Sequence, residues 1–307
     1  MSEKILEVEH LSVVFGRGKK AFKAVDDVSF SLEKGENFGI VGESGSGKTT
    51  IGRTIMRICR AAEGSVKFKG EVISGKVSNK NDKKLTDQIQ MIFQDPMSSL
   101  NERAKVGYIV SEGLYRDKTL SRAAREDRAA KALIEVGLRT ELASRFPHEF
   151  SGGQRQRIGI ARAMVMEPEL IIADEPISAL DMSIRAQVLN VMNRLKREHA
   201  LTMIFISHDL SVTRFICDRI ACLHKGVLVE MADTETLYSN PLHPYTQSLL
   251  SAVPQPDPRA EKKKKLIAYD ASMHDYTVDK PIWCEIAPGH FVRGSEKELE
   301  KYRGTLL

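Results

Sequence analysis

The feature that most constrains this chain is a glycine-rich string between an apolar run and a helical pattern. Asn37–Val41 has the composition of a buried strand, and Ile51, Ile55 and Ile58 have the spacing of one buried helix face. The string between them fits G-x-x-x-x-G-K-[ST], the pattern of a phosphate-binding loop, and its strand and helix neighbours are those that such a loop requires. We therefore expect a nucleoside triphosphate to bind at this string. Its residues are Gly42, Glu43, Ser44, Gly45, Ser46, Gly47, Lys48, Thr49 and Thr50.

The residue types in this string suit a phosphate ligand. Gly45 and Gly47 allow consecutive backbone N–H groups to curl around the phosphates, and the helix start presents its positive end to the same anion. Lys48 is expected to reach the β- and γ-phosphates, and the Thr49 hydroxyl to ligate Mg²⁺. The alternative, a flexible glycine turn, does not account for the strand and helix on either side.

Composition predicts a globular protein without a strong charge bias. The 307 residues carry 46 Lys and Arg against 41 Asp and Glu, a net charge of +5. This small, dispersed excess favours a solvated face over a nucleic-acid surface. Four cysteines without C-x-x-C spacing predict free thiols in a reducing compartment. No apolar run approaches the length of a membrane span, and the N-terminus lacks a signal-peptide layout. If the protein acts at a membrane, we therefore expect it to do so from the cytoplasmic side and through a partner.

The N-terminal residues predict antiparallel strands. Ile5–Phe15 and Ala24–Leu32 have strand patterns, and Gly64–Ile73 continues them. Phe15, at a strand end, is a candidate for stacking on adenine, with Phe22 a weaker one. An ordinary hairpin aromatic remains the alternative for Phe15.

The middle of the chain predicts a loop, a short strand and then helices. Ser74–Lys84 is polar and indicates a surface loop, whereas Ile89–Gln94 indicates a core strand. Residues from about 96 to 166 have mainly helical spacing. Ser151 is a natural N-cap for a helix reaching Val165.

Polar residues follow several predicted core strands. Gln94 ends one, Asp174 and Glu175 end the apolar run that begins at Leu170, and His208 follows another. Asp174 is expected to hold Mg²⁺ and Glu175 to accept a proton from the attacking water. Gln94 is expected to touch Mg²⁺ or that water. His208, after a strand beside a phosphate loop, is expected to lie in the ligand crevice of an open α/β sheet.

A second glycine pair opens the helix after Phe150. Two adjacent glycines at a helix start expose N–H groups to an anion, although alone they indicate only a cap. We include this string among the nucleotide-binding candidates. Its residues are Ser151, Gly152, Gly153 and Gln154.

Together these elements resemble the nucleotide-binding subunit of ATP-binding cassette (ABC) transporters over about residues 5–258. The motifs in the family's order are Walker A at Gly42–Thr49, the Q-loop at Gln94, the signature at Ser151–Gln154, Walker B at Leu170–Asp174, the catalytic Glu175, the D-loop at Ser178–Asp181 and the switch His208. The resemblance implies an α/β fold: a P-loop NTPase core of RecA type, an antiparallel β subdomain and a helical signature subdomain at about 96–166. It implies an ATPase using ATP and Mg²⁺. The implied catalytic residues are Glu175, His208, Gln94 and Lys48, and the implied metal ligands are Thr49, Gln94 and Asp174.

Further stretches look like the oligopeptide, dipeptide and nickel importer group. They are Phe93–Asn101, Pro147–Arg157 and Asn240–Pro258. The tail segments Tyr269–Tyr276 and Glu285–Val292 are similar to the second, F-type, ATPase subunit of oligopeptide permeases. The expected organisation is a nucleotide-binding domain at 1–258 and a C-terminal extension typical of peptide importers at 259–307.

The end of the chain supports narrower expectations. A short helix at about Tyr245–Ala252 should be stopped by Pro254 and Pro256. Many members of the importer group that the chain resembles carry a C-terminal cysteine cluster for an iron–sulfur centre, but only Cys284 lies in this tail, so no such centre is expected. Lys262–Lys265 reads as a solvated linker rather than a contact with anionic lipid.

The resemblance implies that the chain powers oligopeptide import from the cytoplasmic face of the cell membrane, as a peripheral subunit. The implied partners are a homologous ATP-binding subunit in a heterodimer, two transmembrane permease subunits and, indirectly, an extracellular peptide-binding protein, with no nucleic acid. The alternatives are a dipeptide or nickel importer, or a non-transport ABC ATPase of repair or ribosome-associated type.

Overall fold

The computed structural model describes residues 3–254 and 264–305, whose contacts divide into two compact units. Unit 1 is formed by Glu33–Glu36 and Lys76–Ile206, together with Glu3. Unit 2 contains Lys4–Leu32, Asn37–Gly75 and the described residues from Ser207 onward. The predicted boundary between residues 258 and 259 lies outside the described residues, as do Pro256 and Lys262.

Parallel strands form the core of unit 1. β6 (Ile89–Ile92), β7 (Leu170–Asp174) and β8 (Thr202–Ser207) are hydrogen-bonded in that order. Every residue of β7 and β8 is buried, as expected for parallel strands covered on both faces. Because parallel strands have their carboxyl ends at the same edge, the residues that follow β6 and β7 lie close together.

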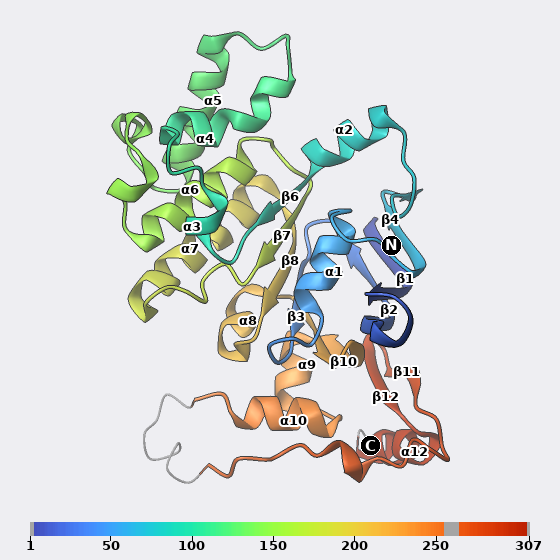
Figure 1. The fold of residues 1–307 in the computed structure, drawn as a ribbon. Coiled ribbons are helices and arrows are strands. Elements are labelled where there is room, and N and C mark those ends of the chain that lie inside the picture. Colours follow the sequence, from blue (N-terminus) through green and yellow to red (C-terminus); the bar gives the residue numbers. More distant parts are fainter. Residues whose placement is uncertain (1–2, 255–263, 306–307) are drawn as a thin grey trace. The chain divides into compact units, whose positions relative to one another are not determined.

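Four helices of unit 1 pack against α6. α6 contacts α3, α4, α5 and α7, and α4 also contacts α5 (Figure 1). Ser151 caps α6 as predicted, and the mainly helical character of residues 96–166 is confirmed. The helices and 3₁₀ turns are α2 (Asn79–Gln88), α3 (Pro96–Ser99), α4 (Val106–Ser111), η2 (Glu112–Arg116), α5 (Arg122–Glu135), η3 (Thr140–Ser144), η4 (Pro147–Glu149), α6 (Gly152–Met164) and α7 (Met182–His199).

Two local predictions were wrong. Most of the expected loop Ser74–Lys84 belongs to α2, because the Ser78 hydroxyl accepts a hydrogen bond from Asn81 N–H and caps a helix that buries little beyond Leu85. A helix with one buried apolar residue leaves almost no periodic signal. Ile58, expected on a buried face, is 59% exposed. The reason is that its helix α1 (Lys48–Ile55) ends at Ile55 and the chain then turns through Arg57 at φ +63°.

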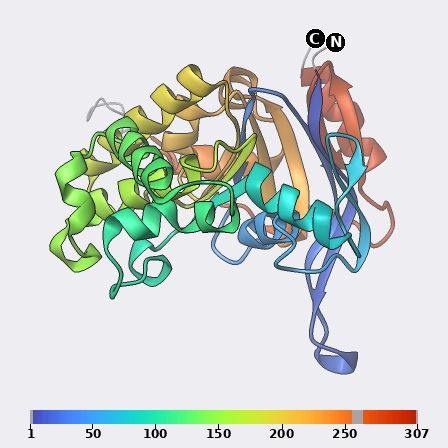
Figure 2. The same ribbon diagram turned by 90° about the horizontal axis from the view of Figure 1, so that it is seen from above.

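Unit 2 begins with an antiparallel sheet. Its strands follow the order β2 (Phe22–Glu33), β1 (Lys4–Phe15), β4 (Glu63–Phe68) and β5 (Glu71–Val72). The β1–β2 connection carries η1 (Gly18–Lys20) and projects beyond the neighbouring strands of this unit (Figure 2). The predicted N-terminal strands are thereby confirmed.

A second group of strands in unit 2 supports the predicted phosphate loop. β3 (Asn37–Val41) is parallel to β9 (Arg219–His224), and β10 (Val227–Asp233), β12 (His290–Gly294) and β11 (Ile282–Ala287) continue antiparallel from β9. The remaining elements are α8 (Leu210–Ile216), α9 (Thr234–Ser239), α10 (Pro244–Ser251), η5 (Ala271–Met273) and α12 (Glu296–Thr305). The predicted helix near Tyr245 is confirmed as α10.

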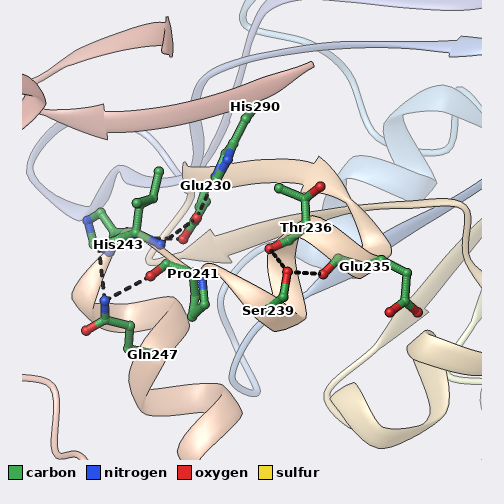
Figure 3. Close-up of polar contacts among 9 residues, drawn as sticks. Glu230, Glu235, Thr236, Ser239, Pro241, His243, Gln247 and His290 are labelled. Atoms are coloured by element: carbon green, nitrogen blue, oxygen red, sulfur yellow. Dashed lines mark hydrogen bonds and ion pairs between the residues drawn. The ribbon is translucent and has the colours of Figure 1, made fainter. Parts of the chain in front are cut away.

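A buried carboxylate joins the elements before α10 to β12. Glu230 has no exposed surface and accepts hydrogen bonds from the N–H groups of Leu242 (2.8 Å) and His243 (3.0 Å). Its Oε1 also lies 2.8 Å from Nε2 of the buried His290 (Figure 3). These donors offset the cost of burying a carboxylate, so Glu230 fixes the chain where α10 begins.

His243 caps α10 in its neutral form. Its Nδ1 accepts a hydrogen bond from Tyr245 N–H at 3.1 Å, so this nitrogen carries no proton. Burial, reinforced by the nearby His274, lowers the pKa of His243 to about 3 from its ordinary 6.5. Between pH 6.5 and about pH 3, the side chain of His243 therefore binds a proton in the unfolded chain but not in the native chain.

The free energy of unfolding should therefore decrease as pH falls from about 6.5 toward 3, with His243 contributing up to about 1.4 kcal/mol per pH unit. His243→Asn keeps a capping side chain without a titrating ring. We expect a shallower pH dependence for this variant in urea unfolding at pH 4–6. If the free energy of unfolding of this variant changed with pH as steeply as that of the unaltered chain, the pH dependence could not be assigned to His243.

Candidate nucleotide-binding site

The phosphate loop, residues 42–50 of unit 2, surrounds a buried lysine. Lys48 is 4% exposed, and its Nζ donates to the carbonyl oxygens of Gly42 and Glu43, each at 2.8 Å. A buried ammonium must have partners, and the loop supplies them from its own backbone. The Lys48 ammonium, which we expect to bind the phosphates, thus lies directly against the loop backbone.

Two glycines of the loop permit its close packing. A Cβ on Gly42 (φ +154°) would lie 2.1 Å from the Leu223 carbonyl oxygen, and one on Gly47 (φ +106°) 2.4 Å from the Ala24 carbonyl oxygen. Both neighbours are backbone atoms, so they cannot move aside as a side chain would. At Gly45 (φ +78°), by contrast, a Cβ would have no neighbour within 4 Å, and only the backbone conformation favours glycine there.

The residues of this loop suit a phosphate group. Gly47 is the N-cap of α1 and provides no side-chain cap, and the first N–H groups of a helix have no acceptor within the helix. Together with the Lys48 ammonium they form a set of donors suited to an anion. The buried Ser46 hydroxyl has no hydrogen-bond partner within the described residues. The donor set therefore fits a polyphosphate.

The loop is held from outside by residues far along the chain. Gly226 N–H donates to the Ser46 carbonyl oxygen at 2.9 Å. The hydroxyl of Tyr245 accepts a hydrogen bond from Glu43 N–H at 3.1 Å. Tyr245 was noted in the sequence only as part of a short helix, and its contact with the loop was missed.

Unit 1 brings together two of the predicted residues. Gln94 follows β6 and Glu175 follows β7, and Gln94 Nε2 donates to Glu175 Oε2 at 3.0 Å. Gln94 is exposed and Glu175 half-buried, so both remain accessible to solvent. The parallel register of β6 and β7 brings the pair together, because both residues follow the carboxyl ends of neighbouring strands.

Glu175 has an uncommon backbone conformation. Its φ is +45°, a region that side chains other than glycine seldom occupy, while its N–H donates to the Ile206 carbonyl oxygen at 3.0 Å. Such strain costs on the order of 1–3 kcal/mol and is concentrated at functional sites. Asp174 next to it is only 3% exposed and still belongs to β7. Adjacent carboxylates thus occupy different environments.

The signature string opens α6 through reciprocal capping. Ser151 Oγ accepts from Gln154 N–H at 3.3 Å, and Gln154 Oε1 accepts from Ser151 N–H at 3.0 Å. Ser151 and Gly152 are exposed, whereas Gly153 is buried. A Cβ on Gly153 would meet Ile184 Cγ2 of α7 at 2.2 Å, so this glycine also permits helix packing.

The remaining candidates are exposed or half-buried. Phe15, the last residue of β1, is 45% exposed, and Phe22, the first of β2, is 62% exposed. His208 directly follows β8 and is exposed. Thr49 and Thr50 are half-buried in the first turn of α1.

Family models match two segments of the chain. The ABC transporter model matches residues 25–178, which contain the phosphate loop, Gln94, the signature string and Glu175. A model described as the C-terminal region of oligopeptide/dipeptide transporters matches residues 229–277, which contain α10. The two matches cover separate parts of the chain in the expected order.

Relatives match the chain along its length. The oligopeptide transport ATP-binding protein OppF of Streptococcus pyogenes serotype M1 is 57% identical over 307 residues, covering 100% of both chains. AmiF of Streptococcus pneumoniae, with the same description, is 56% identical with the same coverage. OppF of Bacillus subtilis is 50% identical over 304 residues, covering 98% of this chain and 100% of its own.

Solved structures share the fold. A dimeric ATP-binding cassette in a post-hydrolysis state, bound to ADP and Pi, is 27% identical with a TM-score of 0.68, covering 75% of this chain and 99% of its own. The cbiO1 protein of Clostridium perfringens, part of an ABC transporter complex, is 27% identical with a TM-score of 0.69, covering 78% and 92%. The α/β fold predicted from the motifs is thereby confirmed. The chain belongs to the ABC transporter family, and within it to the oligopeptide transport ATP-binding proteins.

Proposed function

We propose that this chain binds ATP with Mg²⁺ at the phosphate loop and hydrolyses it to power oligopeptide import through a membrane transporter. The buried Lys48, held by two loop carbonyls, is the observation that carries the proposal. An ammonium so placed can exchange these neutral acceptors for charged phosphate oxygens, and hydrogen bonds to charged groups are the stronger ones. The names of the relatives supply the transported class, oligopeptides.

The phosphate loop supplies binding. Lys48 and the N–H groups at the start of α1 would hold the phosphates. Thr49, Gln94 and Asp174 would provide the oxygen ligands that Mg²⁺ prefers. When bound, the ion neutralises charge on the phosphates. Phe15 is our candidate for stacking on adenine, because it is an exposed aromatic at the end of β1.

Glu175 supplies the base. Its carboxylate is half-buried and accepts a hydrogen bond from Gln94, which fixes its position without neutralising its charge. A carboxylate so oriented can accept the proton of an attacking water. Gln94 would orient Glu175 and the water, and His208 would contact the γ-phosphate.

The signature string of this chain is assigned to the ATP that a second ATP-binding subunit holds. Ser151 and Gly152 are exposed at the start of α6, so this helix end is available to a nucleotide on another chain. In the proposed heterodimer, Ser151, Gly152, Gly153 and Gln154 complete the partner's site and the partner's equivalents complete this one. The bound ATP would contact both subunits of the closed dimer. After hydrolysis these shared contacts are lost, the nucleotide no longer binds the closed state more tightly than the open one, and the dimer opens.

The proposed assembly places the chain on the cytoplasmic side of the cell membrane. No described helix has the length and hydropathy needed to cross a bilayer. The partners would be a homologous ATP-binding subunit and two permease subunits, with an extracellular peptide-binding protein acting through the permease.

The alternative to oligopeptide import is the import of dipeptides. A dipeptide transport ATP-binding protein of Lactococcus lactis, DppF, is 45% identical over 305 residues, below the 57% of OppF from Streptococcus pyogenes. Uptake of defined peptides by the purified complex in vesicles separates the two. ATP-dependent uptake of peptides longer than two residues is expected, and transport of dipeptides alone would contradict the proposal.

Glu175→Gln should separate hydrolysis from binding. The amide keeps the size of the side chain but removes the proton acceptor, so we expect hydrolysis to fall on the order of 10²–10⁴-fold. ATP affinity should be nearly unchanged, because Lys48 and the loop N–H groups are intact. Single-turnover hydrolysis and equilibrium binding in the assembled complex measure the two quantities.

Lys48→Ala is the matched variant, because it removes the phosphate-binding charge and leaves Glu175 in place. Weak ATP binding is expected of it. Near-normal hydrolysis by Glu175→Gln would mean that the base lies elsewhere, with His208 the next residue to test.

Assembly should control turnover. Because the signature string of one chain is assigned to the nucleotide of the other, the isolated chain should bind ATP yet hydrolyse it slowly. Addition of the cognate ATP-binding and permease subunits should raise the rate strongly. Full activity from a dilute monomer, independent of concentration, would contradict the composite site.

A further inference from the structure

The peptide group between Gly42 and Glu43 is held at both of its polar atoms. Its N–H, on Glu43, donates to the Tyr245 hydroxyl at 3.1 Å. Its carbonyl oxygen, on Gly42, accepts from Lys48 Nζ at 2.8 Å. A trans peptide is planar, with N–H and C=O on opposite sides. Fixing the N–H therefore fixes the direction in which the carbonyl faces Lys48.

The ring of Tyr245 is held firmly. It is 1% exposed, and its centroid lies 4.2 Å from that of His224 and 5.3 Å from that of Tyr269. Its backbone N–H is bound by His243, whose own N–H is bound by Glu230. The hydroxyl is consequently presented to the loop from a well-packed position.

The loop side of this contact has equally little freedom. Gly42 lies against the Leu223 carbonyl oxygen, which leaves no room for a Cβ. Leu223 and His224 are consecutive residues of β9, so the strand that limits Gly42 also carries the ring that packs on Tyr245. One strand of unit 2 therefore packs against both the loop, at Gly42, and the ring of Tyr245.

We propose that Tyr245 is a positioning residue for the phosphate loop: its hydroxyl fixes the Gly42–Glu43 peptide and thereby raises the affinity for the triphosphate. This inference rests on the proposed ATP site at the loop. Tyr245 lies within residues 229–277, so the C-terminal transporter region acts directly on nucleotide binding.

The proposal predicts an effect on binding and not on the chemical step. Without the hydroxyl, the peptide group keeps its hydrogen bond to Lys48 but loses the one at its N–H, so the loop spends less time in the conformation that receives phosphates. Apparent affinity falls with the fraction of binding-competent loop. The loss of one hydrogen bond corresponds to a decrease of about three- to tenfold in affinity. Once ATP is bound, Glu175 and Gln94 are unaltered, so kcat should stay within about twofold.

Tyr245→Phe tests this with Tyr269→Phe as the matched control. Both variants lose one hydroxyl from the same aromatic cluster, but within the described residues the Tyr269 hydroxyl makes no hydrogen bond. The full-length chain is used for ATP binding by calorimetry, and the assembled transporter for KM and kcat. Tyr245→Phe should raise Kd and KM for ATP about three- to tenfold, and Tyr269→Phe should change neither.

Hydrogen exchange at Glu43 provides a readout that does not depend on activity. Its amide should exchange faster in Tyr245→Phe than in Tyr269→Phe or the unaltered chain, and thermal unfolding establishes that each variant is folded. Unchanged exchange and ATP affinity in a folded Tyr245→Phe would overturn the proposal. So would equal weakening by Tyr269→Phe, or a fall in kcat alone. Failure of the unaltered chain to bind ATP would instead contradict the proposed ATP site itself.

Discussion

The buried carboxylate of Glu230 is the constraint on which much of unit 2 depends. A carboxylate without solvent must receive hydrogen bonds, and those of Glu230 come from Leu242, His243 and His290. Its donors lie before α10 and in β12, while Glu230 itself lies in β10. Loss of any of these partners would leave a buried charge incompletely paired. β12 and the start of α10 therefore lie where they can provide hydrogen bonds to Glu230 of β10.

This arrangement makes the C-terminal region part of the nucleotide-binding unit rather than an appendage. Leu242 packs with Val292, Leu299 and Tyr302, so an apolar cluster covers the elements that Glu230 joins. Hydrophobic burial supplies the bulk of the stabilisation here, and the carboxylate specifies which segments meet. The residue next in this chain of contacts is Tyr245, which reaches the phosphate loop.

Local patterns predicted most of the fold and most of the candidate residues. The strand–loop–helix around Lys48, the apolar run to Asp174 and the cap at Ser151 each depend on residues adjacent in sequence, so short windows contain the whole signal. The sequence pattern places Gln94 and Glu175 at strand ends, and the parallel pairing of β6 and β7 in the structure explains why the two meet. In contrast, α2 depends on a serine cap with one buried leucine, and Ile58 on where α1 terminates. The first leaves almost no period in the sequence, whereas the second follows a clear period, Ile51, Ile55 and Ile58, that continues past the end of α1.

The contact between Tyr245 and Glu43 was beyond sequence reasoning for a different reason. It joins residues separated by 202 positions, and it involves a backbone N–H, which every residue except proline has. Nothing in the identity of Glu43 indicates an external partner. Tyrosine in a short helix is equally compatible with ordinary packing. Only the joint placement of β9, α10 and the loop reveals that the hydroxyl has this acceptor role.

Asp174 and Glu175 show how a change of backbone conformation gives two adjacent carboxylates different environments. Asp174 keeps the extended conformation of β7, pairs in register with Ile206 and is almost completely buried. Glu175 leaves the strand through a positive φ and becomes half-buried beside Gln94. A buried carboxylate is suited to a cation, whereas a partly solvated one can exchange a proton with water. The positive φ at Glu175 is thus what gives the neighbouring carboxylates the two environments on which their proposed roles, metal binding and proton transfer, depend.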